Sequence, residues 1–111
     1  MYQIKSRIWI EGKKGVFLGE GRIKILKAII REGSLSKAAK SLGMSYKKAW
    51  NLVNSINKNA QSPVVITNTG GNGGGGTTVT AYGKEIIVSF EKINQNCWEF
   101  LDKQLKEHQI S

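Results

Sequence analysis

Residues 33–50 read GSLSKAAKSLGMSYKKAW and predict two short helices joined by a sharp turn. The first helix would bury side chains that recur at steps of three or four, namely Leu35, Ala38, Ala39 and Leu42. Gly43 permits the positive φ of the turn, and Ser45 is a good N-cap for the helix that follows. The pattern is typical of a helix-turn-helix.

The flanking segments predict the rest of one domain spanning residues 1–111. Apolar and polar residues alternate from Tyr2 to Ile10, which indicates a half-buried strand, and helical spacing then places Ile23, Leu26, Ile29 and Ile30 on one helix face. The predicted fold is α+β and mainly α, a winged helix-turn-helix. Its parts are N-terminal strands 2–18 forming a β-hairpin, helix one 21–32, the helix-turn-helix 34–59, the wing 62–80 and a long C-terminal dimerisation helix 81–107.

Basic side chains are concentrated in part of the chain. The net charge is +9, and residues 33–84 contain six basic side chains and no Asp or Glu. Residues 85–111 contain three basic and five acidic side chains. Positive charge concentrated in one segment attracts a polyanion, and a nucleic-acid phosphate backbone is the commonest such partner.

The second helix of the motif carries a polar face opposite its aliphatic one. Lys and Asn suit reading of the major groove, because an ammonium group donates to guanine and an Asn amide pairs with adenine. A solvated helix face is the alternative, but the glycine turn and the acid-free stretch favour base reading. The candidate base-reading residues are Lys47, Asn51 and Asn54, with Ser45, Tyr46 and Trp50 as neighbours.

The first helix of such a motif crosses the nucleic-acid backbone, so its exposed polar side chains are candidates for phosphate contact. Solubilising charge is the alternative explanation for the lysines. The candidate phosphate-binding residues are Ser34, Ser36, Lys37, Lys40, Lys48 and Lys58.

A glycine tract interrupts the predicted wing, with six glycines among residues 70–76. So much glycine indicates close approach to a partner or mobility. A phosphate-binding P-loop is disfavoured, because Thr77 and Thr78 lead into a strand and not into a helix. A hairpin tip without contacts is the remaining alternative. The candidate wing contacts are Thr69, Gly71, Asn72, Gly73 and Gly74.

The C-terminal helix has a wider apolar face than a small domain can cover. Self-association explains the surplus, and contact through this acidic segment would avoid repulsion between basic subunits. Packing on helix one alone is the alternative. The candidate dimer-interface residues are Ile86, Phe90, Ile93, Cys97, Trp98 and Leu101.

Several classes of function are disfavoured. One cysteine and one histidine, Cys97 and His108, do not make a metal cluster, and no cofactor is expected. No acid and base are paired, and no Ser or Cys has a nearby His, so an enzyme is not expected. Neither a membrane span nor a signal peptide is apparent, which favours the cytoplasm.

Five stretches carry a resemblance to a known family: LGEGRI (18–23), GSLSKAA (33–39), LGMSYKKAW (42–50), TGGNGGGGT (69–77) and VTAYG (79–83). Over residues 3–105 the chain resembles the N-terminal winged-helix domain of ModE-type molybdate-responsive transcriptional regulators, relatives of the LysR-type DNA-binding domain. The resemblance implies a homodimer that binds double-stranded DNA at palindromic operators.

Molybdate-sensing members of that family carry a further C-terminal region, and this sequence ends at Ser111. We therefore expect a sequence-selective regulator without the molybdate-binding region, whose signal comes from elsewhere, such as a separate sensor protein. The alternative from another class is a winged-helix module that binds protein without specific DNA readout.

Overall fold

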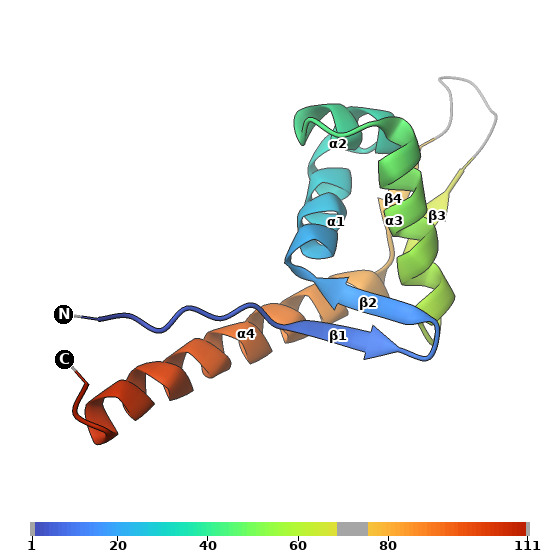
Figure 1. The fold of residues 1–111 in the computed structure, drawn as a ribbon. Helices are drawn as coiled ribbons and strands as arrows, with labels where there is room; N and C mark the ends of the chain where they lie inside the picture. The colour runs from blue at the N-terminus through green and yellow to red at the C-terminus, as the bar shows by residue number, and fades with distance from the viewer. Residues whose placement is uncertain (1, 69–75, 111) are drawn as a thin grey trace.

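The computed structural model describes residues 2–68 and 76–110. Two antiparallel β-hairpins, β1–β2 and β3–β4, flank the helices and form separate sheets, which confirms the predicted mainly α winged helix (Figure 1). In chain order the elements are β1 (Trp9–Gly12), β2 (Gly15–Gly19), α1 (Glu20–Glu32), α2 (Leu35–Ser41), α3 (Tyr46–Asn59), β3 (Val65–Thr67), β4 (Thr77–Val79) and α4 (Ala81–Glu107).

The helices begin and end at residues suited to capping. Ser34, Ser45 and Thr80 are the N-caps of α2, α3 and α4, and each side chain accepts a hydrogen bond of 3.0–3.1 Å from the amide three residues further on. Gly33 and Gly43 adopt φ of 75° and 67°, which only glycine adopts without strain. The turn at Gly43 and the cap at Ser45 confirm the two predictions made for these residues.

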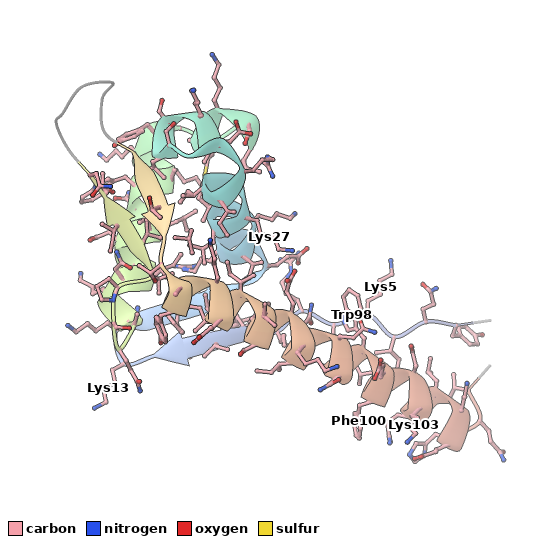
Figure 2. All side chains as sticks on the ribbon, turned by 180° about the vertical axis from the view of Figure 1, so that it is seen from behind. Lys5, Lys13, Lys27, Trp98, Phe100 and Lys103 are labelled. Carbon is pink, nitrogen blue, oxygen red and sulfur yellow. The ribbon has the colours of Figure 1, made fainter. Side chains whose placement is uncertain are left out.

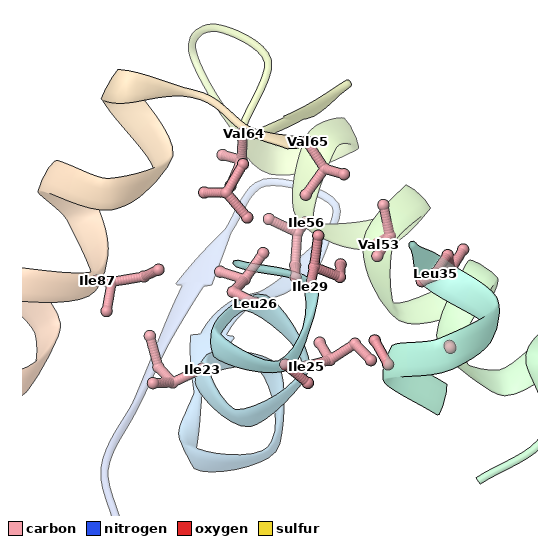
Figure 3. Close-up of a cluster of buried hydrophobic side chains, with 14 of the residues drawn as sticks. Ile23, Ile25, Leu26, Ile29, Leu35, Val53, Ile56, Val64, Val65 and Ile87 are labelled. Carbon is pink, nitrogen blue, oxygen red and sulfur yellow. The ribbon is translucent and has the colours of Figure 1, made fainter. Parts of the chain in front are cut away.

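Helix α1 lies at the centre of the core, between α2, α3, the β3–β4 hairpin and the start of α4 (Figure 3). The prediction for Ile30 was wrong: this side chain is 46% exposed, whereas Ile25 is fully buried. The reason is that several elements surround α1. Its buried surface is therefore wider than a single helical stripe and is not centred on the predicted face. The buried side chains of α1 are Ile23, Ile25, Leu26, Ala28 and Ile29.

The predicted strand from residue 2 onward was also wrong in its extent. The ladder begins at Trp9, which pairs with Gly19 at the end of β2. Because β2 has only five residues, no partner strand lies opposite residues 2–8. That segment instead runs beside α4 (Figure 1), where the Ser6 Oγ and Cys97 Sγ atoms are 3.9 Å apart.

Helix α4 joins the core only through its first three turns. Its buried residues are Gly83, Ile87 and Phe90, and Lys27 of α1 forms an ion pair with Glu91 just beyond them. The remaining residues of this 27-residue helix project away from the domain (Figure 1). The described chain is consequently elongated, measuring 62 × 28 × 21 Å.

We expect Gly83→Ala to destabilise the fold, although alanine is ordinarily the better helix former. The added Cβ would lie 2.6 Å from Val79 Cγ1 and 2.7 Å from the Val64 carbonyl oxygen. That oxygen accepts a hydrogen bond from the Thr80 amide and is not free to move. Urea unfolding should show a loss of about 1–3 kcal/mol, typical of overpacking.

The matched control is Gly21→Ala in α1, where an added Cβ meets nothing within 4 Å. This variant should be neutral or slightly stabilised. Equal gains in stability for both variants would contradict the close packing of α4 on the β3–β4 hairpin.

Candidate nucleic-acid interface

The solvent-facing side of α3 brings the predicted base-reading residues together. This follows from the helical period, because α3 buries the opposite side through Ala49, Val53 and Ile56. The result is an amide and ammonium surface bordered by two aromatic rings. All of Ser45, Tyr46, Lys47, Trp50, Asn51 and Asn54 are exposed.

The predicted phosphate-contact residues are divided between α2 and α3. Ser36, Lys37 and Lys40 are exposed on α2, and Lys48 and Lys58 are exposed on α3. Ser34 is half-buried, and its hydroxyl group is already engaged as the N-cap of α2. Its first role is therefore to begin that helix.

The lysines of α2 and α3 are free to meet an external anion. Each ion pair of the described residues 2–68 and 76–110 draws its base from residues 7–31 and its acid from Glu20, Glu32 or Glu91. The acid-free segment therefore keeps its charge, while the rest of the domain neutralises part of its own.

The tip of the β3–β4 hairpin lies outside the described residues, and with it the predicted wing contacts Thr69, Gly71, Asn72, Gly73 and Gly74. Its base is described. Val65 pairs with Val79, and the Asn68 amide donates to the Gly76 carbonyl at 2.8 Å. The described pairing of the two strands therefore extends to Asn68 and Gly76.

Asn57 attaches the wing to α3, and the sequence interpretation did not assign it a role. Its Oδ1 accepts hydrogen bonds from the amides of Val64 and Val65 at 2.9 and 3.1 Å, and its Nδ2 donates to the Val65 carbonyl at 2.9 Å. The sequence carried little signal for this role, because at 100° per residue Asn57 points between Tyr46 and Trp50, on the border between the polar and aliphatic faces of α3.

Thr77 attaches the other strand of the wing to the start of α2. Its amide donates to the Gly33 carbonyl at 3.1 Å, and its hydroxyl accepts from the Leu35 amide at 3.3 Å. Both strands are thus bound to the helix-turn-helix, which sets the direction in which the wing leaves the domain.

Arg22 connects α1 to α3 on the other side of the core. Its guanidinium donates to Ser55 Oγ at 3.2 Å, and that hydroxyl lies 3.4 Å from the Val16 carbonyl oxygen. Burial lowers the pKa of Arg22 from its ordinary value. This contact fixes α3 against both α1 and β2.

The predicted dimer residues fall into two groups. Phe90 is only 3% exposed and, with the half-buried Ile86, belongs to the core of the single chain. Ile93 and Trp98 are about half-exposed, and Cys97 and Leu101 are half-buried. In Figure 2, Trp98 points toward the N-terminal segment and Phe100 away from it. The free apolar surface therefore lies on the projecting part of α4.

Comparison with known proteins identifies the family to which this arrangement of helices belongs. The model for the bacterial regulatory helix-turn-helix proteins of the LysR family matches residues 21–84, from α1 to the start of α4. The chain belongs to this LysR family. The match includes the whole α2–α3 pair and both described strands of the wing.

Within the LysR-type helix-turn-helix proteins, the predicted resemblance to ModE-type regulators is confirmed. The chain is 36% identical over 105 residues to the molybdenum transport protein ModE of Azotobacter vinelandii, covering 92% of this chain and 39% of that protein. It is 40% identical over 93 residues to the DNA-binding transcriptional dual regulator ModE of Escherichia coli, covering 84% and 36%. The molybdenum-pterin-binding protein MopB of Rhodobacter capsulatus is 40% identical over 81 residues, covering 73% and 30%.

The chain therefore spans little more than a third of the length of these two ModE relatives. In the described part of this LysR-family chain, no helix combines the length and the apolar character needed to cross a membrane. The same residues contain no group of three His, Cys, Asp or Glu side chains placed to hold a metal ion.

Proposed function

We propose that this chain is a sequence-selective, double-stranded DNA-binding regulator of transcription. The observation that carries the proposal is the exposed face of α3, where Asn51 and Asn54 lie beside Lys47 within an acid-free segment, and Lys47 forms no ion pair with any other described residue. A helix of this kind reads base edges from the major groove, while the first helix of the motif crosses the backbone. The related Escherichia coli protein is itself named as a DNA-binding regulator.

A salt titration separates this function from its rival, a winged-helix module that binds an acidic protein. Binding to a duplex should weaken steeply with salt, with a log–log slope of about −0.9 for each phosphate neutralised. Selection from a random duplex library should recover a preferred sequence. Binding that is equal for all duplexes and weaker than binding to an acidic protein would favour the rival. The same selection with and without molybdate tests whether that oxyanion is the effector.

Replacing Asn51 with Ala should relax the preference at one base pair of the selected site. The reason is that the amide pairs with both N6 and N7 of adenine, and loss of such a contact costs about 1–3 kcal/mol at that position. Competition binding with duplexes that differ at single base pairs measures the change.

Lys48→Ala is the matched control on the same helix. Its side chain is assigned to phosphate, so affinity for cognate and random duplexes should fall about equally. An Asn51→Ala variant that loses affinity equally for both kinds of duplex does not read bases through Asn51.

The proposed regulator acts as a homodimer formed through α4. The projecting part of α4 exposes Ile93 and Trp98 beyond the reach of the chain's own core. Residues 85–111 carry more acidic than basic side chains, so subunits can meet there without the repulsion expected between two basic faces. A two-fold dimer presents two α3 helices to a palindromic operator, whose half-sites lie about 34–36 Å apart.

A further inference from the structure

The turn between β1 and β2 is held against the C-terminal end of α3. Asn59, the last residue of α3, accepts a hydrogen bond from the Lys14 amide at 2.9 Å through its Oδ1. Its Nδ2 donates to the Ser55 carbonyl at 3.0 Å and lies 3.5 Å from the Val16 carbonyl oxygen. The turn and the helix end are therefore joined by one side chain.

Close packing at Gly12 strengthens this junction. A Cβ at this position would lie 2.6 Å from Asn59 Oδ1, so only glycine lets the turn approach the helix end so closely. The hydrogen bond from Lys14 to Asn59 joins residues 45 positions apart in the chain. Its consequence is that the side chains of the turn keep a defined position relative to α3.

Two exposed lysines, Lys13 and Lys14, occupy this turn. Figure 2 shows Lys13 pointing outward beside the C-terminal end of α3. Neither lysine forms an ion pair with any residue of the described segments 2–68 and 76–110. The nearest acid along the chain, Glu11, accepts a hydrogen bond from the Trp9 indole instead. The turn therefore adds two positive charges without ion-pair partners among the described residues at the C-terminal end of α3.

The position of this turn along α3 favours contact with the phosphate backbone over contact with bases. Recognition helices of this motif contact bases through their N-terminal residues. Asn59 lies eight residues beyond Asn51, which is about 12 Å along the axis at 1.5 Å per residue. Side chains held at this end are therefore away from the base edges that Lys47 and Asn51 would contact, and the anion that borders the groove there is the phosphate backbone.

We propose that Lys13 and Lys14 form a second phosphate-binding site, on the backbone at the opposite end of α3 from α2. This site extends the proposed DNA-binding function and depends on it, because its ligand is the phosphate backbone of the same duplex. It contributes affinity without sequence preference, and Asn59 and Gly12 position it. The domain then contacts the backbone on both sides of the groove that α3 enters.

The test compares the salt dependence of binding for the wild-type chain and for the double variant Lys13→Gln, Lys14→Gln. Loss of two phosphate contacts should reduce the steepness of the log–log slope by about 1.8, equally for selected and random duplexes. The matched control is Lys103→Gln, Lys106→Gln, which removes the same charge from exposed positions at the far end of α4. Its slope should stay close to that of the wild type.

A second variant tests position separately from charge. Asn59→Ala keeps both lysines but releases the turn. The log–log salt slope should therefore become less steep than that of the wild type, by less than in the Lys13/Lys14 double variant, and the preferred sequence should be unchanged. Equal slopes for the Lys13/Lys14 variant and the Lys103/Lys106 control, with wild-type binding intact, would overturn the second site alone. Absence of duplex binding by the wild type would overturn the proposed function and this site with it.

Discussion

Asn57→Ala should destabilise the domain and detach the wing from α3. The substitution leaves the amides of the buried Val64 and Val65 and one carbonyl oxygen without their partner. A buried group left unpaired costs about 1–3 kcal/mol, and partial access of water limits the total here to about 3–5 kcal/mol. Such a loss is a large share of the stability of a small domain. Urea unfolding measures it.

Two further variants identify the cause of that loss. Asn57→Asp keeps an oxygen that accepts from both amides but removes the donor to the Val65 carbonyl, so it should recover a substantial part of the lost stability. Asn54→Ala removes an exposed amide from the same helix and should change the unfolding free energy by no more than about 0.5 kcal/mol. Equal losses for Asn57→Ala and Asn54→Ala would show that the three hydrogen bonds do not hold the wing.

The second large effect is expected from Ile93→Asp on the projecting part of α4. Ile93 is 50% exposed in the single chain, and a two-fold interface would bring two new carboxylates close together. Sedimentation equilibrium should show a monomer. Binding to a palindromic duplex should fall by about 100-fold or more, because the second half-site is no longer engaged within one complex.

Val88→Asp is the control for this substitution. Val88 is 67% exposed on the same helix, and at 100° per residue it lies about 160° around the axis from Phe90, which is at the middle of the apolar arc. It should leave both the assembly and the affinity unchanged. A monomeric Ile93→Asp variant that binds the palindrome as tightly as the wild type would contradict the need for a dimer, and an intact dimer would place the interface elsewhere.

Phe90 and Trp98 of α4 show why the proposed dimer face could be predicted only in part. The α4 wheel groups Phe90 with Ile93 and Trp98, since all three fall on one broad apolar arc. Only the position of the domain along the helix separates them: Phe90 lies where the core reaches α4, and Trp98 lies beyond it. Helical periodicity shows the direction in which a side chain points. It does not show how far along the helix the rest of the domain extends to bury that side chain.

The sequence by itself determined the features that depend on neighbouring residues. Ser45 caps a helix through the amide three residues away, Gly43 supplies positive φ, and the period of α3 separates its polar face from its aliphatic one. Each of these follows from backbone geometry and hydrogen bonding within about one helical turn. The family resemblance rested on the same stretches, and the match over residues 21–84 agrees with it.

Only the tertiary structure decided which surfaces are covered and which segments touch. In the tertiary structure Ile30 is exposed, and the first strand begins only at Trp9 because no partner strand lies opposite residues 2–8. Asn59 holds a turn 45 residues away against α3. These outcomes depend on the shape of the whole core, since a side chain is buried only where another element arrives to cover it. Local pattern thus determined the helix-turn-helix, and packing determined what it is attached to.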